Sequence, residues 1–219
     1  MIITVKKRKE GAYMITMVAF NMEGTLIKNR NSWNSVMNAL SQNPYFNINY
    51  SFNYLYSNLN NKININMNNN ELNDIIINSF NYQAIYEGID DTIDLLHQNG
   101  IKAIIITTGV KQYAKLMSKQ YSFDGYIGNE IKSVNGKIKF IQNIDPLKKG
   151  AILNKIRMKR GYRKDNILSI GSSIMDLSMK SSSGKFIAFN PDSNEVKRCA
   201  DLEVESNSVY DIFNLKMIA

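Results

Sequence analysis

Short apolar runs that each end in small polar residues constrain the fold of this chain more than any other feature of its sequence. Runs with the length and apolar content of buried strands occupy residues 14–20, 101–106, 167–170 and 185–189, with shorter candidates at 125–127 and 202–204. Apolar residues at helical spacing lie between most of them, as in 89–96 and 148–160. This alternation predicts an α/β fold in which a doubly wound parallel sheet has helices on both faces.

Small polar residues stand at the expected carboxyl ends of three of these strands. They are Asn21, Thr107, Thr108, Ser172 and Ser173. Parallel sheets bind their ligands at this edge, so we expect the functional residues there. The alternative is that these small residues only form tight turns between a strand and the next helix.

Residues 31–83 differ in composition from the rest of the chain. They hold the only tryptophan, Trp33, and most of the asparagines, and the stretch 60–74 is low in complexity. Apolar residues at helical spacing nevertheless predict short helices within this segment. We therefore expect a core domain formed by 1–30 and 84–219, with 31–83 inserted as a small, Asn-rich helical cap over the ligand edge of the sheet.

Charge and residue counts narrow the classes of function. The formal net charge of +8 favours an anionic ligand or a nucleic acid, and a solvated basic face is the alternative. A single cysteine, Cys199, and a single histidine, His97, exclude an intramolecular disulfide and a multi-histidine metal site. No apolar run reaches the roughly 20 residues that span a bilayer. We expect a soluble, cytoplasmic protein with no membrane partner.

Four motifs, in order along the chain, resemble those of the haloacid dehalogenase superfamily. Residues 20–26, FNMEGTL, resemble the first motif, normally Asp-x-Asp-Gly-Thr-Leu, and 105–109, IITTG, resemble the second. Residues 148–153, KKGAIL, resemble the lysine motif, and 171–179, GSSIMDLSM, resemble the fourth, normally Gly-Asp-Gly-x-Asn-Asp-x-x-Met. A predicted hairpin at 128–140 extends the resemblance to the phosphoserine-phosphatase-like branch. The resemblance implies a Rossmannoid core with a cap.

The resemblance also implies a chemistry. In this family a first-motif carboxylate attacks phosphorus, and a second carboxylate two residues later acts as acid and base. Mg²⁺ is held by the nucleophile, a backbone carbonyl and a carboxylate of the fourth motif. By position, Thr107, Thr108 and Lys149 would hold the phosphoryl oxygens, with Lys148 the alternative if the register differs by one.

This chain departs from the pattern where the chemistry is hardest to replace. Asn21 stands at the nucleophile position, Glu23 at the acid/base position and Ser172 at a metal-binding aspartate. A neutral amide oxygen is a poor nucleophile, and Mg²⁺ prefers charged oxygen ligands. With Asn21, Glu23, Ser172 and Asp176 at the metal positions, the expected Mg²⁺ site is weak or absent.

These departures predict a catalytically impaired relative of phosphoserine phosphatase that retains a cleft for phosphate or another anion. Its partner would be a small phosphorylated or anionic ligand, or a protein. Arg30 could face this cleft. One alternative is an atypical Mg²⁺-dependent phosphoric monoester hydrolase in which Glu23 acts as base. A second alternative is a nucleic-acid-binding protein that uses the basic surface.

Overall fold

The computed structural model describes residues 4–6, 12–42, 63–64 and 67–214. Residues 43–62 and 65–66 of the Asn-rich segment therefore lie outside the described residues, as do residues 7–11. The low-complexity stretch was expected to form a loop near 60–70, but its residues 69 and 70 begin a helix. No described helix is both long enough and apolar enough to cross a membrane.

The centre of the molecule is an eight-stranded sheet in the order β10-β9-β8-β3-β5-β6-β7-β4. The first six strands in this order run parallel and the last two are antiparallel additions. Their bounds are β10 Leu202–Val204, β9 Lys185–Phe189, β8 Ile167–Gly171, β3 Met17–Phe20, β5 Lys102–Val110, β6 Gly125–Val134, β7 Lys137–Ile141 and β4 Ile63–Asn64. The predicted doubly wound α/β fold is confirmed.

Two predicted strands have different bounds in the structure. The run at 14–20 is divided, because Met14 ends β2 (Ala12–Met14), which pairs with β1 (Thr4–Lys6), and the central strand begins at Met17. Strand β5 does not end at 106 but continues through Thr107 and Thr108, with a shift in its pairing with β6 before Val110. Thr107 and Thr108, which we expected to follow the strand, therefore lie within the irregular last part of β5.

Helices cover both faces of the sheet. Alternating residues of β3 separate the two hydrophobic clusters, because Val18 and Phe20 belong to one and Met17 and Ala19 to the other. The first cluster includes residues of α4 (Ile89–Gln98), α5 (Lys111–Gln120) and α8 (Asp211–Asn214). The second includes residues of α6 (Lys149–Lys159), the 3-10 helix η3 (Asp176–Ser182) and α7 (Asn194–Cys199). Shorter 3-10 helices are η1 (Pro146–Lys148) and η2 (Lys164–Asn166).

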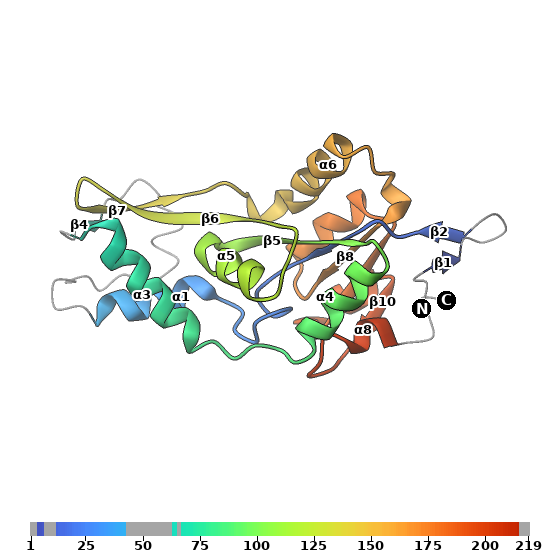
Figure 1. Ribbon diagram of the computed structural model, residues 1–219, viewed down its shortest axis with the longest axis horizontal. Coiled ribbons are helices and arrows are strands. Elements are labelled where there is room, and N and C mark those ends of the chain that lie inside the picture. The colour runs from blue at the N-terminus through green and yellow to red at the C-terminus, as the bar shows by residue number, and fades with distance from the viewer. Residues whose placement is uncertain (1–3, 7–11, 43–62, 65–66, 215–219) are drawn as a thin grey trace.

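The described part of the inserted segment lies at one end of the molecule. It forms α1 (Ser32–Ser41), α3 (Asn69–Asn81) and the short strand β4, which pairs with β7. The hairpin of β6 and β7 extends from the core to reach this end (Figure 1). Two of the predicted helices are present in the described part of the segment, while the apolar residues Leu55 and Leu59 lie outside it. The segment also adds a strand to the sheet.

The hairpin forms where the Asn-Gly pair predicts it. Asn135 and Gly136 both have positive φ, 53° and 71°, as a type I′ turn requires. Val134 and Lys137 flank the turn as paired residues. The two-residue turn fixes the register of the pair, so that Ile131 and Ile138 turn inward and are buried in the first cluster.

A buried tyrosine links α3 to the core. The Tyr113 hydroxyl on α5 lies 2.7 Å from Ser79 Oγ on α3, and its ring packs edge-to-face on Phe80 at 5.2 Å between ring centroids. Burial of the phenol raises the pKa of Tyr113 to about 12 from its ordinary value of 10.0. The protonated phenol is therefore the form that the fold stabilises.

We expect Tyr113→Phe to lower the free energy of unfolding by about 1 kcal/mol at neutral pH, because one buried hydrogen bond is lost. A pKa raised by folding contributes stability that is present below the unfolded value of 10.0 and is lost as the pH rises toward 12. Urea unfolding of both proteins between neutral pH and pH 11 tests this. The advantage of the wild type should shrink above pH 10, and a constant difference would contradict the prediction.

Candidate functional site

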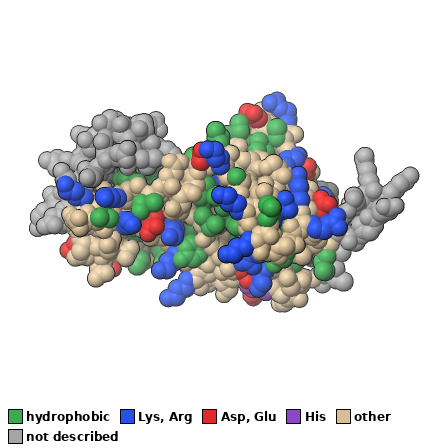
Figure 2. Space-filling view, turned by 90° about the horizontal axis from the view of Figure 1, so that it is seen from above, with side chains coloured by type: hydrophobic (Ala, Val, Ile, Leu, Met, Phe, Trp, Pro, Cys, Tyr) green, Lys and Arg blue, Asp and Glu red, His purple; other side chains and the backbone are tan. Residues whose placement is uncertain are grey.

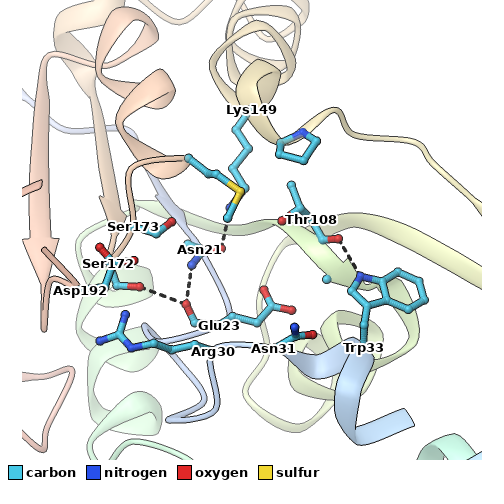
Figure 3. Close-up of a pocket in the computed structure, with 13 residues that line it drawn as sticks. Asn21, Glu23, Arg30, Asn31, Trp33, Thr108, Lys149, Ser172, Ser173 and Asp192 are labelled. Carbon is cyan, nitrogen blue, oxygen red and sulfur yellow. Dashed lines mark hydrogen bonds between the residues drawn. The ribbon is translucent and has the colours of Figure 1, made fainter. Parts of the chain in front are cut away.

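A cavity of about 560 Å³ opens at the carboxyl ends of β3, β5 and β8, beside the start of α1 (Figure 3). It is the edge of the sheet at which the sequence predicted function. The polar and charged residues of the lining include Asn21, Glu23, Arg30, Thr108, Lys149, Ser172 and Asp192. Residues from all four motifs thus come together, although they are separated by up to about 150 positions in the chain.

Two hydrogen-bond partners, the Glu23 carbonyl and Lys149, set the orientation of the Asn21 amide at the end of β3. Its Nδ2 donates to the backbone carbonyl of Glu23 at 2.6 Å, and its Oδ1 accepts from Lys149 Nζ at 2.8 Å. Figure 3 shows the side chain held between these partners. The side chain is 3% exposed, so a flipped amide would place its NH₂ against a buried ammonium. The oxygen at the nucleophile position is therefore neutral and already hydrogen-bonded to the lysine.

Lys149 is the first residue of α6, and the positive charge of its ammonium is balanced by the carboxylate of Asp176. Its Nζ lies 2.5 Å from Asp176 Oδ1, and both side chains are buried, 2% and 0% exposed. The other oxygen of Asp176 accepts from the backbone N–H groups of Ser172 and Ser173 and from the Ser173 hydroxyl, each at 2.9 Å. Lys148 makes an exposed ion pair with Asp145 instead. The structure thus brings Lys149, and not its neighbour, to the cavity.

The carboxylate of Glu23 joins the first motif to the second motif and to α1. Its Oε1 accepts from the Ser32 hydroxyl at 2.5 Å, and its Oε2 accepts from the Thr107 hydroxyl. The two hydroxyl oxygens accept in turn from the N–H groups of Val110 and Gly109. A Cβ at position 109 would stand 1.4 Å from Glu23 Oε1, so any larger residue there would displace the Glu23 carboxylate. Both carboxylate oxygens are occupied by hydroxyl donors.

The two threonines of the second motif have different roles in the structure. Thr107 is fully buried, and its hydroxyl is committed to Glu23 rather than presented to the cavity. Thr108 lines the cavity, and its carbonyl accepts from Trp33 Nε1 at 3.1 Å and from Asn129 Nδ2 at 2.9 Å. These bonds fix the wall of the cavity next to α1.

The residues at the metal positions do not fit Mg²⁺. The Glu23 carbonyl, which the resemblance assigns to the metal, already accepts from Asn21 Nδ2 and from the Ser172 hydroxyl at 3.2 Å. Both oxygens of Asp176 have protein donors. Within the described ranges, no group of three or more His, Cys, Asp or Glu side chains gathers as a ligand cluster. Mg²⁺ loses its hydration shell reluctantly and needs charged oxygen ligands. Here Asn21 and Ser172 are neutral, and the oxygens of Asp176 are already hydrogen-bonded to protein donors.

Arg30 and Asp192 complete the charges around the cavity. The Arg30 guanidinium donates to the carbonyl of Asn190 at 2.7 Å and remains exposed. Asp192 is also exposed, and its backbone N–H donates to the Ser172 carbonyl at 2.8 Å. The lining therefore holds two cations, Arg30 and Lys149, and two carboxylates, Glu23 and Asp192.

Ser32 and Asp192 were not predicted from the sequence as residues of the site. The signal for Asp192 was available, because it follows β9 at the same edge of the sheet as the other site residues. The signal for Ser32 was weaker. The side chain of a glutamate at position 23 is one methylene longer than that of the aspartate in the family pattern. In the structure this longer side chain places the carboxylate against the hydroxyl groups of Ser32 and Thr107.

We expect Glu23→Gln to destabilise the protein by about 1–3 kcal/mol, because its NH₂ group would face one of the two buried hydroxyl donors. Chemical denaturation gives the free energy of unfolding. Asp192→Asn is the matched control, since this carboxylate lines the same cavity but has no side-chain partner among the described residues, and it should change stability by less than about 0.5 kcal/mol. Equal effects of the two substitutions would refute the structural role of Glu23.

No family model matches the chain. A phosphoserine phosphatase of Archaeoglobus fulgidus is 26% identical over 107 residues, which cover 48% of this chain and 31% of that relative. The matching region therefore spans about a third of the relative's length.

Solved structures match over nearly the whole chain. A phosphoserine phosphatase in its apo form matches with a TM-score of 0.72 and 17% identity, covering 92% of this chain and 98% of the other. A substrate-bound phosphoserine phosphatase complex matches at 0.73 and 18%, covering 91% and 97%. A hydrolase of the same superfamily from Salmonella enterica matches at 0.68 and 15%, covering 86% and 67%. At the level of the fold, the resemblance to the phosphoserine-phosphatase-like branch of the haloacid dehalogenase superfamily is confirmed.

Proposed function

We propose that this chain is a phosphoserine-phosphatase-like protein that has lost metal-dependent phosphoryl transfer and uses its cleft to bind a small anionic ligand. The observation that carries the proposal is the position of the Asn21 amide, held between the Lys149 ammonium and the Glu23 carbonyl. The same proposal includes a cytoplasmic location, with a protein as the alternative partner to the small anionic ligand.

The loss of phosphoryl transfer is supported at each step of the family chemistry. An amide at position 21 forms no stable phosphoenzyme, because attack through its oxygen leaves a cationic imidate ester. Glu23 has both carboxylate oxygens bound by hydroxyl groups of Ser32 and Thr107, so neither is directed at a leaving group. The charge of Lys149 is already balanced by Asp176, which reduces what it can offer to a phosphoryl group in the transition state.

Ligand binding without turnover is supported by the cavity itself. Its volume of about 560 Å³ lies within the range of small-molecule sites. Arg30 is the exposed cation in the lining, and a guanidinium with free N–H groups suits a carboxylate or phosphate. Trp33, Pro146 and Met175 add apolar side chains to the lining of the cavity. We therefore favour a small anion that carries an apolar portion.

The direct test is phosphate release from a panel of phosphomonoesters, with and without Mg²⁺, for the purified wild type and for Asn21→Ala. We expect no release above the protein-free background in any of these reactions. Mg²⁺-dependent release that disappears in Asn21→Ala would overturn the proposal and favour the atypical hydrolase.

A second test asks whether two carboxylates restore the metal site. Asn21→Asp removes the N–H donor from the Glu23 carbonyl, and Ser172→Asp places a second carboxylate beside that carbonyl. We expect Asn21→Asp/Ser172→Asp to bind Mg²⁺ in isothermal titration calorimetry, and the wild type to show no binding. Glu23 is retained because its carboxylate holds Ser32 and Thr107. The two single variants are the controls, and Mg²⁺ binding by the wild type would contradict the proposal.

A further inference from the structure

A second pocket lies away from the cleft, between α3, α5 and β6. Its volume is about 350 Å³. Cap residues Asn69 and Asn73 form one side, and the first turns of α5 and the middle of β6 form the others. We call it the junction pocket, because the inserted segment and the core both contribute to it.

Lysines dominate the charge of the junction pocket. Lys111, Lys115 and Lys132 line it, and the only carboxylate in the lining is Glu130. Lys111 Nζ pairs with Glu130 Oε2 at 3.3 Å, whereas Lys115 and Lys132 have no carboxylate within 4.0 Å among the described residues. The formal charge of the lining is thus three positive against one negative, a net of +2, which matches a phosphate dianion.

The neighbouring strand adds to this positive charge. Lys132 on β6 is directly opposite Lys139 on β7 in the antiparallel register. Opposed residues of such a pair lie on the same face, and like charges there are destabilising. Lys139 has no carboxylate partner in the described part of the chain. Figure 2 shows that Lys and Arg side chains are widespread on one face of the molecule, where Asp and Glu side chains lie beside some of them.

Neutral hydrogen-bonding groups make the pocket more than a basic patch. Asn69 exchanges two hydrogen bonds with the backbone of Ser133, at 2.8 and 3.0 Å, and so fixes the start of α3 against β6. The side chains of Asn73 and Tyr126 line the pocket and make no hydrogen bond with another described residue. An amide and a phenol are therefore available beside the two unpaired lysines.

We propose that the junction pocket binds the phosphate group of a small phosphorylated molecule, separately from the cleft. Lys115 and Lys132 contact the phosphate oxygens, and Asn73 or Tyr126 donates to the same group or to the remainder of the ligand. A bound dianion balances the net charge of the lining and relieves the repulsion between Lys132 and Lys139. The site does not depend on the function proposed for the cleft.

The test is titration of the full chain with inorganic pyrophosphate in isothermal titration calorimetry at low salt. The pocket variant is Lys115→Gln/Lys132→Gln. The matched control, Lys119→Gln/Lys137→Gln, removes the same charge from α5 and the hairpin, at exposed positions outside the lining. Arg30→Gln reports binding in the cleft instead.

We expect the wild type to bind pyrophosphate and the pocket variant to bind at least about tenfold more weakly, because two charge-assisted contacts are lost. The control should stay within about twofold of the wild type. The proposal is overturned if the wild type shows no binding up to about 10 mM, or if the pocket variant and the control lose affinity equally. It is also overturned if only Arg30→Gln loses binding, or if single-stranded RNA binds and pyrophosphate does not.

Discussion

The buried ammonium of Lys149 sets the organisation of the cleft. An ammonium that is 2% exposed is tolerated only where charge and hydrogen bonds compensate for its lost hydration. Asp176 supplies the charge and Asn21 the second acceptor. Because the Asn21 oxygen turns to the lysine, its NH₂ group turns to the Glu23 carbonyl, and that carbonyl is then no longer free to hold a metal. The Lys149–Asp176 ion pair thus sets the orientation of the Asn21 amide, and through it the hydrogen bonding of the Glu23 carbonyl.

Glu23 has a comparable effect on the joint between the core and the inserted segment. Its carboxylate collects hydroxyl groups from α1 and β5, and each hydroxyl also accepts a backbone N–H near the end of β5. The residue that resembles a catalytic acid by position is therefore part of the packing between segments. The Tyr113–Ser79 contact makes a second joint between the same two parts of the molecule.

Fold and chemistry have separate requirements in this protein. The sheet, the helices on its faces and the hairpin need only apolar periodicity, turns and buried area, and all of these are present. Phosphoryl transfer needs particular atoms at the strand ends, and here an amide, a hydroxyl and an occupied carboxylate stand in their places. Binding places weaker demands on a site than catalysis does, since it needs complementary charge without a reacting atom. The ligand binding that we propose for the cleft and for the junction pocket rests on that weaker demand.

Much of the fold could be predicted from the sequence, because its signals are local. The apolar runs became β3, β5, β8 and β9, the Asn-Gly pair formed its turn, and the order of the motifs placed Asn21, Lys149 and Ser172 at one edge of the sheet. The partners of the site residues could not be predicted. Thr107 turns to Glu23 across 84 positions, and Lys149 turns to Asn21 across 128. Such pairings depend on where distant strand ends and α1 meet in space and on the need of each buried polar atom for a partner, which the tertiary structure alone decides.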